Sequence, residues 1–360
     1  MMEKNIINLA LKGGGVKGIA YVGSLKELDK RGHYNTIKRV SGTSAGALVA
    51  LMIALKLSPD QMEELMRGLD FNSFKRGWNP IRIFTKYGLY TGDAILDFIE
   101  KCYHRSPLFL KRESTFQDLK EAGGRDLIVF ASNLNENTLN EFSEHQTPNC
   151  IVAEAVRASM SIPIFFKSWK FSNGIPNDHI YVDGGVTFNY PLSFFDHPEF
   201  NEDPWTPNEE TLGLFLEQQS VYEHFEKNPL NPDNPKRHKS SVFKRYINKF
   251  KYNAWITSYF KHLFSTILNS QNIGLFEESF LVRRTVFIDD LGISATKFNL
   301  NDADKDDLIK SGSVGVLRYF EYLESLDKKY TNYRQTITDE HSKSFNPGHA
   351  SKSGETTEIT

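Results

Sequence analysis

The strongest constraint on the fold of this chain is one pentapeptide, Gly42-Thr43-Ser44-Ala45-Gly46, between a short apolar strand and an apolar helix. Residues 39–40 are expected to form the strand. Residues 47–57 are apolar on nearly every side, so the helix should be buried. In such a G-x-S-x-G turn, small neighbours let the chain pass close to itself, and the serine hydroxyl projects at the carboxyl edge of a sheet. The pattern predicts a serine nucleophile on an α/β fold, and a turn of small residues without catalytic function is the alternative.

A second turn, Gly13-Gly14-Gly15-Val16-Lys17-Gly18, follows an expected strand at 6–11 and precedes an expected helix at 19–31. It fits the glycine pattern of dinucleotide-binding proteins, but these need an acid at the end of the second strand, and none stands there. Bare backbone N–H groups at a helix N-terminus also stabilise an oxyanion. We expect the turn to lie beside Ser44 and serve this purpose. A purely structural turn is the alternative.

The third candidate is Asp183, which ends an expected strand at 180–183 and precedes Gly184-Gly185. Its carboxylate should also project at the sheet edge. The chain has ten histidines, but none stands in a recognisable strand-end motif, so a Ser-His-Asp triad is not indicated. Taken alone, Asp183 would be interpreted as part of a common Asp-Gly turn.

Strands and helices alternate along most of the chain, which predicts an α/β fold with a parallel or mixed sheet and helices on both faces. The polar end of the chain, from Thr338, is expected to be disordered. Residues 1–330 are therefore assigned to one domain and residues 331–360 to a flexible tail. The further strands are expected at 126–132, 138–143, 211–216 and 282–289, and the further helices at 91–104, 148–160 and 301–326.

Composition excludes several classes of protein. Lys and Arg number 43 against 45 Asp and Glu, which argues against a nucleic-acid binder. Two cysteines cannot form a disulfide framework or a Cys-rich metal site. The longest apolar run, residues 45–55, is too short to cross a bilayer, and the first residues do not resemble a secretory signal.

Two segments are candidates for contact with lipid. Residues 236–276 contain eight Lys or Arg and no acid, interleaved with aromatic and aliphatic residues. The spacing suits an interfacial helix on an anionic membrane; a core helix with a basic solvated face and a lid are the alternatives. Residues 71–90, which include Trp78, are rich in aromatic residues. Packing within a loop is the preferred interpretation there, and lipid entry the alternative.

The three motifs in this order resemble the patatin-like phospholipase family. The stretches 158–166 and 189–191 are similar to that family too, and the resemblance covers about residues 6–326. It implies a three-layer α/β/α fold with a mostly parallel sheet. It also implies a Ser-Asp dyad, with Ser44 as nucleophile and Asp183 as base, and needs no metal or cofactor. Gly14 and Gly15 would donate N–H groups to the oxyanion, and Lys17 would help to position the turn or the anionic intermediate.

The expected function is a lipid acyl hydrolase, most simply a phospholipase A, in the cytoplasm and peripherally bound to the inner face of the membrane. Its partner would be a phospholipid surface; a homo-oligomer is allowed, and nucleic acid is not expected. Alternatives are a neutral-lipid or lysophospholipid hydrolase, a catalytically inert membrane-binding module and, more remotely, an NAD-dependent oxidoreductase. Some compact bacterial members of the family are toxic effectors activated by a cyclic nucleotide, so such a small-molecule activator is a further expectation.

Overall fold

The computed structural model describes residues 5–173, 175–176, 178–203, 206–219, 256–277 and 279–344. They divide into two compact units. The first is a body that ends at Leu317, and the second contains the chain from Arg318. Within the described part of the chain, no helix combines the length and the apolar content that a bilayer span requires.

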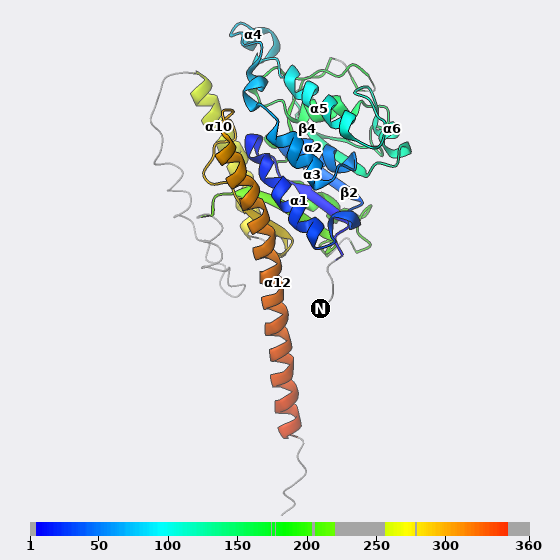
Figure 1. The fold of residues 1–360 in the computed structure, drawn as a ribbon, viewed down its shortest axis with the longest axis vertical. Coiled ribbons are helices and arrows are strands. Elements are labelled where there is room, and N and C mark those ends of the chain that lie inside the picture. Colours follow the sequence, from blue (N-terminus) through cyan, green and yellow to red (C-terminus); the bar gives the residue numbers. More distant parts are fainter. Residues whose placement is uncertain are drawn as a thin grey trace, which may run out of the picture. The chain divides into compact units, whose positions relative to one another are not determined.

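The body is built on a seven-stranded sheet with the order β5-β4-β2-β1-β8-β9 and with β7 also paired to β4 (Figure 1). The neighbours from β4 to β9 are parallel, whereas β5 and β7 run antiparallel to β4. The predicted α/β fold with a mostly parallel sheet is therefore confirmed. The strands are β1 Asn8–Leu11, β2 Arg39–Thr43, β4 Asp126–Asn133, β5 Thr138–Phe142, β7 Tyr181–Asp183, β8 Thr211–Glu217 and β9 Thr285–Asp289, and a separate parallel pair is β3 Gly88–Tyr90 with β6 Ile164–Phe166.

Both faces of the sheet are covered. On one face, Gly42 of β2 approaches the first turn of α2 so closely that a side chain there would overlap the carbonyl of Gly46. On the other face, Thr43 donates a hydrogen bond to the carbonyl of Phe188, and a core forms from β1, β4 and the segment after β7. The main helices are α1 Ala20–Lys30, α2 Ala45–Ala54, α3 Pro59–Arg67, α4 Arg82–Lys86, α5 Asp93–Arg105, α6 Phe116–Glu121, α7 Val152–Ser159, α10 Ile256–Glu277, α11 Ser279–Arg283 and α12 Asp302–Ser344.

Some predicted element bounds are wrong. Helix α7 starts at Val152, four residues after the predicted start, and residues 282–283 belong to α11 instead of β9. Helix α12 continues to Ser344, beyond the predicted end near Leu326, so residues 331–344 of the predicted flexible tail are helical. No Pro or Gly interrupts the chain between Gly315 and the Asn346-Pro347-Gly348 sequence, which explains the longer helix. Residues 236–255 of the predicted basic segment lie outside the described residues.

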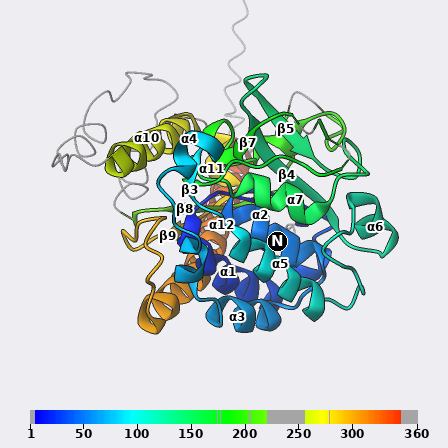
Figure 2. The same cartoon turned by 90° about the horizontal axis from the view of Figure 1, so that it is seen from above.

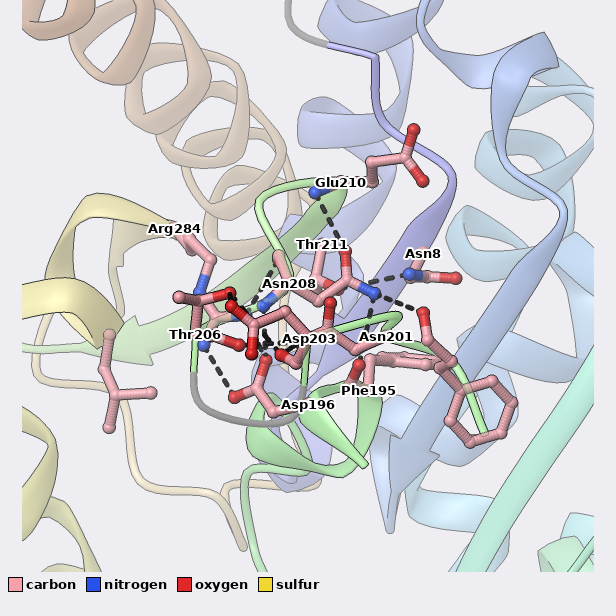
Figure 3. A network of polar contacts seen from close by, with 12 residues as sticks. Asn8, Phe195, Asp196, Asn201, Asp203, Thr206, Asn208, Glu210, Thr211 and Arg284 are labelled. Atoms are coloured by element: carbon pink, nitrogen blue, oxygen red, sulfur yellow. Dashed lines mark hydrogen bonds and ion pairs between the residues drawn. The ribbon is translucent and has the colours of Figure 1, made fainter. Parts of the chain in front are cut away.

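An ion pair between a buried arginine and a half-buried aspartate holds together the edge of the sheet where the parallel strands begin (Figure 3). Arg284, just before β9, is fully buried, and its guanidinium donates two hydrogen bonds to the Asp196 carboxylate, at 2.6 and 2.8 Å. Arg284 also donates to the Asn208 carbonyl, and the Asn208 N–H donates to Asp196. Arg284, Asp196 and Asn208 therefore each form hydrogen bonds with the other two.

Asp196→Asn is expected to lower the free energy of unfolding by about 3–5 kcal/mol, because it leaves a buried guanidinium without its counter-charge. Urea denaturation measures the change. The matched control is Lys120→Met, which breaks the exposed Lys120–Asp126 pair and should cost less than about 1 kcal/mol. Equal losses in the two variants would contradict the assigned role of Arg284.

Candidate active site

The serine elbow has the backbone geometry expected of a strained strand-to-helix turn. Ser44 lies between the last residue of β2 and the first residue of α2, with φ 55° and ψ −124°. A residue other than glycine loses about 1–3 kcal/mol of folding free energy in this backbone conformation. A Cβ at Gly46 would overlap the carbonyl of Leu11, so the close passage of the chain requires glycine there.

The strand register brings Asp183 to this serine. Thr43 of β2 pairs with Phe130 of β4, and Asp183 of β7 pairs with the next β4 residue, Ala131. Because β5 occupies the other side of β4 at both positions, β7 must continue on the side where β2 has ended. The two strands run in opposite directions, so their last residues meet. Ser44 and Asp183 are thus juxtaposed although 139 positions separate them in the chain.

The Asp183 carboxyl is almost completely buried. Its Oδ1 accepts a hydrogen bond of 2.7 Å from the Gly185 N–H, and its Oδ2 has no hydrogen-bond partner among the described residues. Burial raises the pKa of Asp183 from 3.8 to about 7, against the smaller lowering effects of the Ser44 hydroxyl and the Gly185 N–H. A carboxyl with this pKa can exchange a proton near neutral pH.

The glycine turn lies against the elbow. A Cβ at Gly18 would stand 3.0 Å from the Cβ of Ala45. In the turn, the Gly13 N–H donates to the Asn189 carbonyl and the Val16 N–H to the Ala295 carbonyl. The N–H groups of Gly14 and Gly15 have no hydrogen-bond partner in the described part of the chain, as expected of donors at the start of a helix. These two donors are available to a ligand at this end of the turn.

The cationic side chain of the turn points elsewhere. Lys17 pairs with Asp290, at 2.6 Å, in the loop that follows β9. The same loop provides Ala295, whose carbonyl would overlap any Cβ at Gly15, a residue with φ +58°. Of the two roles expected of Lys17, the structure therefore supports positioning of the turn.

Three polar residues that hold the site were not predicted. The Ser44 N–H donates to Ser159 Oγ, and the Asp183 N–H donates to the Ser161 carbonyl, both at 2.9 Å. Arg157, fully buried, donates to Ser161 Oγ at 2.7 Å. Ser159, the last residue of α7, and Ser161, just after it, thus fix the backbones of Ser44 and Asp183. The sequence signal that could have identified them is the spacing of polar residues at 157, 159 and 161 within an apolar stretch.

Helix α10 also contacts the site. Gln271 donates to the Gly185 and Val186 carbonyls and accepts from the Asn189 N–H. Since Asn189 also accepts from Gly13, Gln271 links the segment after Asp183 to the glycine turn. This part of the predicted basic segment is therefore packed against the site.

A narrow apolar cavity begins at Ser44. Its volume is about 30 Å³, which is room for no more than about two or three water molecules. A larger and more open depression of about 780 Å³ lies at the other end of the strands, around Lys38 and Asp126, away from Ser44. The walls of the Ser44 cavity are formed by Gly15, Val16, Ala45, Leu48, Met66, Phe71, Phe74, Met160, Ile162, Phe166 and Phe298.

Three comparisons bear on this arrangement. A family model described as patatin-like phospholipase matches residues 9–196, more than half of the chain. An uncharacterized protein of Acanthamoeba polyphaga mimivirus is 34% identical over 197 residues, 54% of this chain and 63% of that protein. A probable lipid hydrolase of Invertebrate iridescent virus 6 is 26% identical over 188 residues, 51% of this chain and 61% of that protein. The chain thus spans less than two thirds of these relatives.

Among solved structures, the chain is similar to VipD from Legionella pneumophila. The TM-score is 0.53 at 17% sequence identity, and the match covers 88% of this chain and 67% of that one. At this identity the similarity bears on the fold alone.

Proposed function

The chain belongs to the patatin-like phospholipase family, and we propose that it is a lipid acyl hydrolase in which Ser44 is the nucleophile and Asp183 the general base. One observation carries the proposal. The strand register sets Ser44 beside a buried carboxyl with a pKa of about 7, and two N–H donors without partners stand at the adjoining turn.

In the first half of the reaction, Ser44 Oγ attacks the ester carbonyl carbon while Asp183 accepts the hydroxyl proton. The carbonyl oxygen becomes an oxyanion, which the N–H groups of Gly14 and Gly15 stabilise. When the C–O bond of the ester breaks, Asp183 returns the proton to the departing alcohol. The product at this point is an acyl ester of Ser44.

In the second half, a water molecule replaces the alcohol. Asp183 accepts one of its protons as the oxygen attacks the acyl carbon, and the same two N–H groups stabilise the second oxyanion. The Ser44 ester then breaks, the proton returns to Ser44 Oγ, and the fatty acid leaves.

The cavity at Ser44 is where the acyl chain would bind, and Phe298 is one of its wall residues. Phe298 stacks on Phe165 at 5.2 Å between centroids and meets Phe74 and Phe166 edge-on. A fatty-acyl chain needs far more space than about 30 Å³, so at least one wall residue must move. Phe298 lies on the loop after β9, outside the regular elements of the sheet.

Phe298→Ala is therefore expected to raise the rate on a 16-carbon nitrophenyl ester relative to a 4-carbon ester by about tenfold, in the range that pocket methylenes contribute to specificity. The kcat/KM values for a series of ester lengths measure this ratio. The control is Phe116→Ala, which truncates an equally buried phenylalanine of α6 outside the cavity. A ratio that changes as much in the control as in Phe298→Ala would contradict the assignment.

The substrate class that we propose is membrane phospholipid, with neutral lipid as the second candidate. The probable lipid hydrolase among the relatives supports a lipid substrate. Mass spectrometry of the products from mixed phospholipid vesicles tests this. Fatty acid and lysophospholipid should appear in equal amounts, and no product should form with Ser44→Ala. Release from triacylglycerol emulsions without release from vesicles would favour the neutral-lipid alternative.

Regulation by a small molecule, such as a cyclic nucleotide, is a separate part of the proposal. It rests on the family resemblance and not on any group of described residues. The same vesicle assay tests it. Addition of the activator to the protein and vesicles, with no other protein present, should increase product release at least about tenfold.

A further inference from the structure

An exposed apolar cluster stands on the segment from Lys75 to Tyr87, which we call the docking segment. Among the described residues, four of its five large apolar side chains are 52% to 84% exposed, and Ile83 is half-buried, although the sequence favoured a packed loop. The residues just before the docking segment are packed as the sequence favoured, because Phe71 and Phe74 are buried in the cavity wall. The exposed four are Trp78, Ile81, Phe84 and Tyr87. So dense an exposed group marks an interaction site.

The docking segment is also positively charged. It contains four cationic residues, and no acid occurs from residue 71 to residue 92. Arg76 forms an exposed ion pair with Asp97 at 3.5 Å, and Arg82 donates to the Leu89 carbonyl at 3.1 Å. Lys86 is exposed. Charge and apolar content therefore lie on one short, exposed stretch.

This segment adjoins the cavity at Ser44. The strand that follows it, β3, pairs with β6 so that Tyr90 is opposite Phe166, a residue of the cavity wall. Helix α10 contacts β6 as well, and it exposes Tyr259 and Leu263. Figures 1 and 2 both show α4 close to α10. The strand that follows the docking segment and helix α10 thus both contact β6.

We propose that the docking segment is the surface through which the protein binds an anionic membrane. Aromatic side chains that are apolar at one end and polar at the other suit the headgroup region, and basic residues add attraction to anionic lipids. Its use as the route of substrate to Ser44 rests on the proposed function. The binding itself does not.

Cosedimentation of the full chain with sucrose-loaded vesicles tests the proposal. Ser44→Ala serves as the background, so that the lipid stays intact. With vesicles of phosphatidylcholine and phosphatidylglycerol, Phe84→Asp is expected to lower the partition coefficient by at least about tenfold, because an exposed phenylalanine then no longer enters the bilayer. Ile81→Asp should act similarly. Circular dichroism checks that each variant is folded.

The matched control is Phe109→Asp. Phe109 is 94% exposed. It follows α5, a helix of 13 residues that begins at Asp93, after the docking segment, and is about 20 Å long. This variant should bind vesicles within about twofold of its background. The double variant Arg82→Glu and Lys86→Glu should lower binding to vesicles that contain phosphatidylglycerol at least about tenfold. Its partition coefficient should then be the same as with vesicles of phosphatidylcholine alone.

Equal losses in Phe84→Asp and Phe109→Asp, or no binding to either vesicle, would overturn the proposal. So would self-association of the chain that Phe84→Asp abolishes while vesicle binding persists, because the surface would then be a subunit interface. A soluble short-chain ester, assayed with Ser44 intact, separates the two proposals. If vesicles bind as expected but no ester is hydrolysed, the docking surface stands and the proposed function fails. If the ester is hydrolysed but vesicle binding does not depend on Phe84, only the docking surface fails.

Discussion

Ser44→Ala is expected to lower kcat/KM for ester hydrolysis by at least about 10⁴-fold, because the nucleophile of a covalent mechanism is removed. The folded structure should persist, since the Ser44 backbone N–H can still donate to Ser159 Oγ. Initial rates on a soluble ester measure the loss. A variant that retained a tenth of the wild-type rate would contradict the role of Ser44.

Ser44→Gly provides the matched comparison. It removes the same hydroxyl but also relieves the backbone strain at φ 55°, because glycine adopts positive φ freely. It should be as inactive as Ser44→Ala and about 1 kcal/mol more stable than that variant. Urea denaturation measures the difference. Equal stability would mean that the elbow stores no strain.

Asp183→Asn is expected to abolish hydrolysis and, at the same time, to stabilise the folded chain at neutral and alkaline pH. In the folded state the carboxyl keeps its proton up to about pH 7, whereas an ordinary aspartate loses it near 3.8. Between these values the free energy of unfolding of the wild type falls as the pH rises. About three pKa units correspond to about 4 kcal/mol. Asparagine does not titrate, so the advantage of the variant should grow from pH 4 to pH 7 and then stay constant.

Chemical denaturation of both proteins at pH 4, 6 and 8 checks the stability. The matching kinetic expectation is that kcat/KM of the wild type rises about tenfold per pH unit below pH 7 and levels above it, because the free base is required. A pH-independent stability difference together with a flat rate profile would contradict both the burial of the charge and its catalytic use.

The local parts of the site could be predicted from the sequence. Gly42 and Gly46 are needed because a Cβ at either position would overlap a backbone carbonyl. Glycines that are required for this reason can be recognised in the sequence. The alternation of strands and helices likewise predicted a parallel or mixed sheet, and the sheet of the structure is mixed and mostly parallel. The positions of Ser44 and Asp183 at strand ends follow from the same local signals.

The long-range parts could not be predicted from local patterns, and the pairing of Ser44 with Asp183 was expected only from the family resemblance. The meeting of Ser44 and Asp183 depends on the length of β4, which extends past the end of β2 and leaves room for an antiparallel β7. No local pattern encodes that register. The hydrogen bonds of Ser159 and Gln271 to the site also come from distant parts of the chain. Apolar composition alone did not distinguish the buried Phe74 from the exposed Phe84, since only the neighbours in space decide burial.

The central claim is that Ser44 is a nucleophile activated by Asp183. Reaction with a fluorophosphonate, which phosphonylates activated serines, followed by peptide mapping tests it most directly. We expect a single adduct on Ser44 in the wild type, none in Ser44→Ala, and labelling at least about 100-fold slower in Asp183→Asn. An adduct on another residue, or labelling of Asp183→Asn at the wild-type rate, would contradict the claim.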